Sequence, residues 1–257
     1  MRKFDGYLIC SDVDGTFHYG NTIEGNSEAV RYFTENGGRF TFCTGRSADY
    51  LLRPDLNRLI NAPACLFNGS LVYDYRTGSP LRLKRLDFSL SEFLKEILPR
   101  WGNMESLYAY HRSTGDPILL RELHTMREPA QEEYCLKLVC VFRTVEEADA
   151  FRAAAPELSC ARNAFVSKSW GVGVEFNPTD GTKGHALDFI KAHLGNIHTA
   201  IGVGDYENDI PLLTHADIGI AVGNAQPQVK AAASHILRDA RECAFRQLIE
   251  QLDRGEL

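Results

Sequence analysis

Short apolar runs and amphipathic stretches alternate along the first part of the chain. Residues 7–10, 40–43 and 64–67 are apolar runs of strand length, each followed by a polar or glycine-containing turn. A helical pattern that closes at residues 36–38 joins the first two runs, and a helix from Ser47 to about Ile60 is predicted before the third. This order predicts parallel strands joined by right-handed crossovers, with functional residues at the carboxyl ends of the strands.

The pattern changes between about residues 79 and 178. Alternating stretches at 107–110, 118–120 and 135–142 indicate strands, and helical stretches near 90–100 and 145–155 accompany them. Such a mixture is typical of an α+β domain with an antiparallel sheet.

The alternation of strands and helices returns after residue 178. A helix begins near Lys183, and apolar runs at 200–203, 218–222 and 235–237 indicate further strands. We therefore predict an α/β protein with a Rossmann-like, doubly wound parallel-sheet core built from residues 1–78 and 179–257. Residues 79–178 would form an inserted α+β domain.

The composition of the chain excludes several classes of protein but does not indicate an activity. The net charge of −6 argues against a general electrostatic affinity for nucleic acid or anionic lipid. The seven cysteines form no C-x-x-C pair, so neither a zinc ribbon nor a disulfide framework is indicated. We see no signal-peptide core at the amino terminus and no apolar stretch of membrane-spanning length. These features predict a cytoplasmic protein.

Two aspartates, Asp12 and Asp14, follow the first predicted strand and precede Gly15. If the chain stays extended there, residues two apart point to the same side, and the two carboxylates would crowd one place. Like charges that close need a cation, a shared proton or different roles. A carboxylate is a competent nucleophile towards phosphorus, and a second carboxylic acid can protonate the leaving oxygen. The alternative is a strand-end turn, because Asp and Gly both favour turns.

Two further segments also follow strands or open helices. Thr44 and Gly45, ahead of Arg46, offer a hydroxyl and a backbone N–H to an anion, although Thr44 as a helix N-cap explains the pattern equally well. Lys183 falls in the first turn of a helix, where a cation is unfavourable unless an anion also lies there. Taken alone, Lys183 is best interpreted as an exposed surface lysine.

The fourth segment, residues 204–209, follows the strand predicted at 200–203. Asp205 at a strand end can supply a hard oxygen ligand for Mg²⁺. Asn208 and Asp209 lie in the first turn of the next helix, where an acidic residue also complements the helix dipole. An acidic, well-capped helix start is therefore the alternative explanation.

Together, the four segments resemble the sequence motifs of the haloacid dehalogenase superfamily of phosphotransferases, and within it the Cof-type sugar-phosphatase-like hydrolases. The matches are residues 12–16, Thr44 with Gly45 and Arg46, Lys183, and residues 204–209, with support from Asn68-Gly69 and residues 221–225. The resemblance covers the α/β portion of the chain. Over the insert it depends on length and position, because this subfamily carries its large cap domain there.

The resemblance implies a role for each matched residue. Asp12 would be the nucleophile that becomes phosphorylated, and Asp14 the general acid and base. Asp12, Asp14 (through its backbone carbonyl) and Asp205 would bind Mg²⁺, and Asp209 would orient the metal's ligands. The residues that would hold the phosphoryl group are Thr44, Gly45, Lys183 and Asn208.

The implied activity is a Mg²⁺-dependent phosphatase that hydrolyses small phosphorylated metabolites, first of all sugar phosphates, through an aspartyl-phosphate. A phosphomutase or phosphotransferase of the same superfamily and a catalytically idle phospho-ligand-binding regulator are the alternatives. We expect no nucleic-acid or membrane partner, and a monomer or homodimer.

Basic and aromatic residues of the insert are weaker candidates. Some could face the cleft and bind the substrate, although solvated surface charges and core packing are their more common roles. These residues are Arg112, Arg121, Arg127, His111, His124, Trp101 and Trp170.

Overall fold

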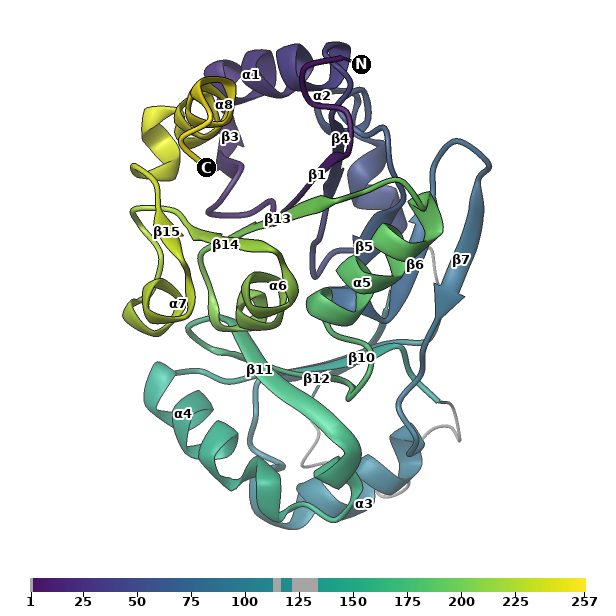
Figure 1. The fold of residues 1–257 in the computed structure, drawn as a ribbon. Coiled ribbons are helices and arrows are strands. Elements are labelled where there is room, and N and C mark those ends of the chain that lie inside the picture. Colours follow the sequence, from purple (N-terminus) through teal and green to yellow (C-terminus); the bar gives the residue numbers. More distant parts are fainter. Residues whose placement is uncertain (1, 113–116, 122–133) are drawn as a thin grey trace.

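The computed structural model of the chain describes residues 2–112, 117–121 and 134–257 (Figure 1). Its central sheet is parallel and has the strand order β15-β14-β13-β1-β4. The strands are β1 (Tyr7–Ser11), β4 (Arg39–Phe42), β13 (Thr199–Gly204), β14 (Ile218–Ala221) and β15 (His235–Ile236). The predicted doubly wound α/β core with an inserted α+β domain is confirmed.

Helices cover both faces of this sheet. Helices α1 (Glu24–Glu35) and α8 (Ala244–Arg254) pack together on one face, and α5 (Lys183–Leu194), α6 (Ile210–His215) and α7 (Pro227–Ala232) lie on the other (Figure 1). None of the helices in the described part of the chain is long and apolar enough to cross a membrane.

A three-stranded antiparallel sheet continues the core beyond β4. It consists of β5 (Ala64–Leu66), β6 (Leu71–Asp74) and β7 (Ser79–Leu83), and a bridge between Cys43 and Cys65 joins it to the end of β4. A two-stranded hairpin of β2 (His18–Tyr19) and β3 (Asn21–Thr22) follows β1.

The helix predicted from Ser47 to about Ile60 is wrong in its length. The structure has a 3₁₀ turn at Ala48–Leu52 and a single helical turn, α2, at Pro54–Asn57. Pro54 disfavours the helical conformation at the residue before it, and Arg53 accordingly has an extended ψ of 127°.

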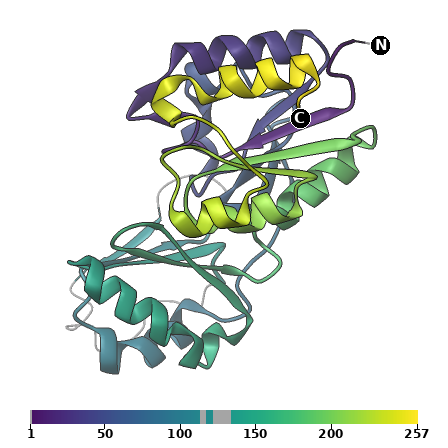
Figure 2. The ribbon, with the colours of Figure 1, turned by 60° about the vertical axis from the view of Figure 1, so that its left-hand side comes forward.

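The inserted domain has a five-stranded antiparallel sheet in the order β11-β12-β10-β8-β9. Its strands are β8 (Ser106–Tyr110), β9 (Ile118–Arg121), β10 (Lys137–Val141), β11 (Ala164–Trp170) and β12 (Gly173–Pro178). Helices α3 (Leu90–Trp101) and α4 (Val145–Ala154) cover the face that points away from the core domain (Figures 1 and 2). Strands β6, β7, β11 and β12 are absent from the sequence-based prediction.

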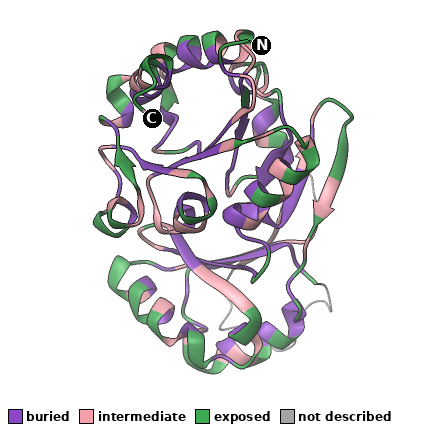
Figure 3. Cartoon of the chain, in the orientation of Figure 1, coloured by how far each residue is buried: buried purple, intermediate pink, exposed green. Residues whose placement is uncertain are grey.

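Among the described residues, the buried apolar side chains form two clusters, one in each part of the molecule (Figure 3). Phe17, Phe42 and Phe245 belong to the first, and Phe93 and Phe176 to the second. Because the insert has its own core, its sheet acts as a separate wall opposite the carboxyl ends of the parallel strands.

The chain enters and leaves the insert at neighbouring places. The Arg82 guanidinium donates to the carbonyl of Asp180, and the Lys84 ammonium pairs with the Asp180 carboxylate. These contacts hold the two connecting segments together.

Candidate active site

The carboxyl ends of the parallel strands bring three of the predicted segments to one edge of the sheet. Asp12 directly follows β1, and its N–H donates to the carbonyl of Val203 at 2.9 Å. Thr44 lies just beyond β4 and Asp205 just beyond β13. Asp12 and Thr44 are buried, as expected for the ends of interior parallel strands.

Lys183 completes this cluster from the first turn of α5. Its ammonium lies 2.6 Å from Oδ1 of Asp12 and 2.5 Å from Oδ1 of Asp209, and its exposed fraction is 0%. Burial lowers the pKa of Lys183, but the two carboxylates outweigh burial and raise it above its usual range. The interpretation of Lys183 as an ordinary surface lysine is therefore wrong, because the helix begins inside the acidic cluster.

The carboxylates of Asp12, Asp205 and Asp209 each place an oxygen within 4.8 Å of the others. Burial raises the pKa of Asp12 well above its usual range, and Asp209 and Asp205 add to this effect while Lys183 opposes it. Burial and the neighbouring Asp209 raise the pKa of Asp205 to about 7. One ammonium does not neutralise three carboxylates, two of them buried and that of Asp205 half-buried, so this donor set fits a hard divalent cation such as Mg²⁺.

The three carboxylates are not equally available to a cation. Oδ2 of Asp209 accepts the N–H groups of Asp205 and Tyr206 at 2.9 and 3.0 Å, while its Oδ1 bonds Lys183. Asp205 accepts the hydroxyl of Thr16 at 2.6 Å through Oδ1. Asp209 therefore holds the strand-end loop that carries Asp205, which leaves Asp12 and Asp205 as the carboxylates that could bind a cation.

Gly15 is required for the close approach of the first and fourth segments. Its φ is +87°, and a Cβ at this position would lie 2.6 Å from Oδ2 of Asp205. Any other residue would therefore be strained and would also push Asp205 away.

Asp14 has partners of its own. Its carboxylate accepts hydrogen bonds from Nε of Arg46 at 3.0 Å and from the hydroxyl of Tyr50 at 3.2 Å, and Nε2 of His18 lies 3.4 Å away. Burial raises the pKa of Asp14, but His18 and Arg46 outweigh burial and bring it well below its usual range.

Asp12 and Asp14 therefore have separate partners instead of competing for one. Strand β1 ends at Ser11, so the alternation of side chains does not extend to Asp14. The chain turns at Val13, whose carbonyl accepts the N–H groups of Phe17 and His18. The two carboxylates line the same cavity with different partners.

The remaining polar residues surround the space in front of Asp12. Thr44 accepts the N–H of Arg46 through its side-chain oxygen at 3.2 Å, and the Asn208 amide donates to Oδ1 of Asn68 at 3.1 Å. Asn68 is buried in a left-handed conformation with φ of 59°. This placement lets one asparagine contact both the core domain and the insert.

A cavity of about 620 Å³ lies between the strand ends and the sheet of the insert. From the core, the lining includes Asp12, Asp14, Thr44, Gly45, Arg46, Ser47, Tyr50, Tyr206 and Asn208; from the insert, it includes Tyr108, Tyr110, Pro117, Lys137, Val139, Val141, Ser169, Trp170 and Glu175. The acidic cluster therefore opens into a space bounded by both parts of the molecule.

The cavity also contains an ion pair that was not predicted from the sequence. Lys137 and Glu175 lie 2.5 Å apart, Lys137 also donates to the carbonyl of Gly45 at 3.2 Å, and Glu175 accepts the Asn68 amide at 2.6 Å. Both side chains are buried. The sequence does contain a sign of this pair, because each residue is a single charge inside an apolar strand. Lys137 lies in Cys-Leu-Lys-Leu-Val, and Glu175 lies in Gly-Val-Glu-Phe.

The candidates proposed for the insert have mixed outcomes. Trp170 lines the cavity, whereas Trp101 packs edge-on against Phe142 and Phe151. His111 and Arg112 are absent from the cavity lining. His124, Arg127 and the side chain of Arg121 lie outside the described part of the chain.

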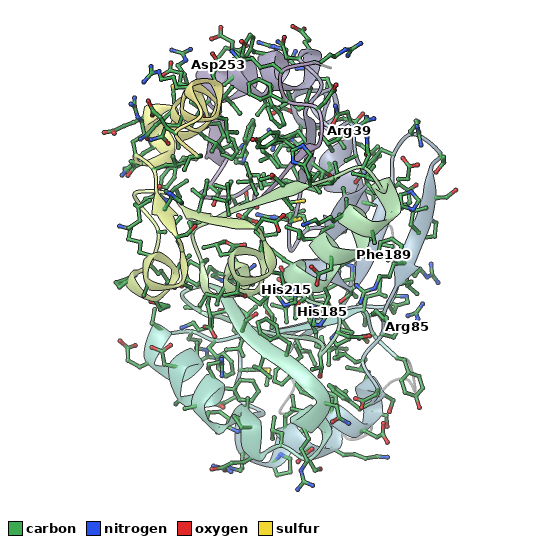
Figure 4. All side chains as sticks on the ribbon, in the orientation of Figure 1. Arg39, Arg85, His185, Phe189, His215 and Asp253 are labelled. Carbon is green, nitrogen blue, oxygen red and sulfur yellow. The ribbon has the colours of Figure 1, made fainter. Side chains whose placement is uncertain are left out.

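A second hollow of about 400 Å³ contains none of the motif residues and is lined in part by Arg85, Asn163, Asp180 and His185. His185 lies beside His215, with ring centroids 5.1 Å apart (Figure 4). Of the motif carboxylates, Asp12 and Asp14 line the larger cavity.

Comparison with known proteins defines the class of this fold and site. The family model of haloacid dehalogenase-like hydrolases matches residues 9–249. The chain belongs to this family, which confirms the resemblance inferred from the motifs and the enzyme class of a phosphatase-type hydrolase.

The chain is similar to individual members over nearly its whole length. It is 24% identical to the pyridoxal phosphate phosphatase YbhA of Escherichia coli (strain K12), over 94% of this chain and 97% of that protein. A HAD/COF-like hydrolase from Plasmodium vivax superposes with a TM-score of 0.80 at 20% identity, over 99% and 97% of the two chains. The HAD subclass IIB sugar phosphatase BT4131 superposes with a TM-score of 0.78 at 18% identity, over 98% and 100%. The structural likeness extends through the cap domain.

Proposed function

We propose that the protein is a Mg²⁺-dependent phosphatase that hydrolyses small phosphorylated metabolites through an aspartyl-phosphate on Asp12. One observation carries the proposal: the buried ammonium of Lys183 joins Asp12 to Asp209 at the sheet edge, in front of the cavity. An anionic nucleophile and an anionic substrate repel each other, and this cation offsets that repulsion.

In the first half of the reaction, an oxygen of Asp12 attacks phosphorus while the bond between phosphorus and the leaving oxygen breaks. Asp14 gives its proton to that oxygen, and the alcohol leaves. Since Arg46 and His18 favour the ionised form of Asp14, protonation accompanies the arrival of a phosphate that competes for Arg46.

In the second half, Asp14 takes a proton from water while the water oxygen attacks phosphorus. The bond between Asp12 and phosphorus breaks, and inorganic phosphate is released. Thr44, the N–H of Gly45, Asn208 and Lys183 would hold the phosphoryl oxygens during both halves.

Asp12, Asp205 and the backbone carbonyl of Asp14 would hold the Mg²⁺, which when bound supplies charge neutralisation of the phosphoryl oxygens. Asp209 would keep Asp205 in place through the two N–H bonds to the strand-end loop.

The separate apolar cluster of the insert supports its use as a cap within residues 79–178, with β7 (Ser79–Leu83) still paired to β6 of the core. Closing the cap over Asp12 would exclude water while the phosphoryl group is transferred. We propose further that the protein acts in the cytoplasm as a monomer or homodimer. Two of its relatives are named as phosphatases of pyridoxal phosphate and of sugars, which supports a small phosphorylated substrate.

The test replaces Asp12 by Asn and measures phosphate release from a panel of phosphomonoesters with and without Mg²⁺. We expect release to fall by at least about a thousandfold, because the nucleophile is lost. The matched control is Asp253→Asn, which changes an aspartate paired with Lys3 on the surface. Equal rates for both variants would contradict the proposal.

A further inference from the structure

Alternate residues along the strands of the cap sheet face the cavity. Leu138, Cys140, Val174 and Phe176 point into the apolar core of the cap, and the residues between them line the cavity. The strand register arranges these lining residues in rows across the sheet. The row nearest to Gly45 contains Tyr110 opposite Lys137.

The next two rows become progressively less polar. In the second, Tyr108, Val139 and Glu175 lie side by side. In the third, Val141 is opposite Gly173, and Gly173 is opposite Trp170. The wall that faces the leaving group is therefore polar near the phosphate-binding residues and apolar farther away.

The charges on this wall are already satisfied within the protein. The carboxylate of Glu175 is bound by Lys137, by the Asn68 amide and by the hydroxyl of Ser169 at 2.5 Å. Buried groups with this many partners offer little to a polyhydroxylated or charged leaving group. Tyr108, Val139, Val141 and Trp170 remain as the contact surface.

A β-bulge places Trp170 on this surface. The pairing of β11 with β12 shifts between Lys168 and Trp170, so that Ser169 is the extra residue and both Ser169 and Trp170 line the cavity. Bulges often re-aim a side chain beside an active site. In a regular strand only one of two successive residues would face the cavity.

Gly173 fixes the position of the indole. A Cβ on Gly173 would lie 2.3 Å from Cζ2 of Trp170, so the ring lies directly over the bare backbone of the neighbouring strand. The side chain is nevertheless 40% exposed. A large aromatic ring that is held in place yet open to a cavity is suited to contact a ligand.

We propose that Trp170 is a specificity-determining residue and that the substrates are phosphomonoesters whose alcohol carries a flat, uncharged ring, such as a heteroaromatic ring. The inference rests on the proposed phosphatase function and narrows its substrate class. The phosphate would lie at Asp12 and Lys183, and the ring against the indole and Tyr108. An aromatic contact of this kind corresponds to a rate difference of about 3- to 10-fold.

The test compares benzyl phosphate with cyclohexylmethyl phosphate, which have similar size and leaving groups of similar basicity and differ in the flatness of the ring. Glucose 6-phosphate represents polyhydroxylated substrates, and acetyl phosphate, which has no ring, measures phosphoryl transfer by itself. We expect the wild-type kcat/KM to be higher for benzyl phosphate than for cyclohexylmethyl phosphate by about 3- to 10-fold, and lowest for glucose 6-phosphate.

Two variants assign this preference to the indole. Trp170→Ala removes the ring, and Gly173→Val displaces it by occupying its place. Both should reduce kcat/KM for benzyl phosphate to the level of cyclohexylmethyl phosphate and change kcat/KM for acetyl phosphate by a smaller factor, whereas Trp170→Phe should restore the preference. Tyr134→Ala is the matched control, because Tyr134 is a 52% exposed aromatic residue of the cap outside the cavity lining.

A binding measurement covers the case in which the Trp170 and Gly173 variants fail to fold. Trp101 and Trp170 are the two tryptophans of the chain, so Trp101→Phe in an Asp12→Asn background isolates the fluorescence of Trp170. Benzyl phosphate should quench it at lower concentrations than cyclohexylmethyl phosphate.

Equal kcat/KM and equal quenching for the two esters, or an equal loss on acetyl phosphate in Trp170→Ala, would overturn the substrate class and leave the phosphatase function intact. Absence of Mg²⁺-dependent release from acetyl phosphate as well would reject the phosphatase function and this inference together.

Discussion

The ammonium of Lys183 lies 2.6 Å from the carboxylate oxygen Oδ1 of Asp12, and neither side chain has more than a small exposed fraction. The two residues are 171 positions apart in sequence. The pair therefore forms only when the two halves of the core sheet, which the cap interrupts, come together.

Removing this cation should reduce stability as well as activity. Lys183→Met leaves Asp12 and Asp209 buried without their shared partner. We expect the free energy of unfolding to fall by about 3–5 kcal/mol, measured by urea denaturation without Mg²⁺. The control is Lys191→Met on the same helix, a lysine in a surface ion pair with Asp217, which should change it by less than about 1 kcal/mol. Similar losses of unfolding free energy in the two variants would show that the buried ion pairs of Lys183 stabilise the protein no more than a surface ion pair does.

Mg²⁺ should stabilise the protein more at alkaline than at acidic pH. Without metal, the pKa of Asp205 is raised to about 7, from about 3.9 in an unfolded chain. A raised carboxyl pKa favours folding at low pH, and this contribution is lost as the pH rises through about 7. Mg²⁺ binds the ionised form, so its addition should increase Tm more at pH 8 than at pH 5.5. Asp205→Asn should remove this pH dependence; a constant increase in Tm for the wild type would contradict the assignment.

The guanidinium of Arg46 should set the pH above which Asp14 lacks the proton that the first half-reaction uses. His18 and Arg46 hold the pKa of Asp14 below its usual range, so Arg46→Ala should raise it and shift the alkaline limb of kcat/KM to higher pH. Arg53→Ala is the matched control, since Arg53 also lies over the Tyr50 ring but pairs with Asp55 instead of Asp14. A shift of equal size in both variants would mean that the change in the pH–rate profile comes from Tyr50 or from the loss of any positive charge near the site.

The ion pair of the cap should show strong coupling. Glu175→Gln leaves the buried Lys137 ammonium without its counter-ion, so we expect the free energy of unfolding to fall by about 3–5 kcal/mol. Lys137→Met combined with Glu175→Gln should cost less than the sum of the two single changes. Denaturation of all four proteins closes the double-mutant cycle, and simple additivity would mean that the two groups do not interact.

The sequence predicted those parts of the site that depend on strand ends. Asp12, Thr44 and Asp205 each follow an apolar run, and parallel topology is sufficient to bring such positions together. The environment of Asp14 could not be predicted in this way, because it depends on the turn at Val13 and on the approach of Tyr50 from a segment that Pro54 breaks.

The cap was predicted as a class of domain, without its chemistry. Lys137 and Glu175 become meaningful only when β10 and β12 are placed side by side, and the short-range pattern gives no strand register. The bulge at Ser169 also prevented a prediction of the cavity lining, because a regular alternation assigns Ser169 and Trp170 to opposite faces.

The contacts of Arg82 and Lys84 with Asp180 have an evolutionary consequence. The chain leaves the core and returns to it at one place. Recombination can therefore replace the cap by another domain with similarly spaced ends without changing the strand order of the parallel sheet. Asp12 and Lys183 lie on the core side of that junction, and the aromatic wall lies on the cap side. New substrate ranges can therefore arise by replacing one continuous stretch of gene.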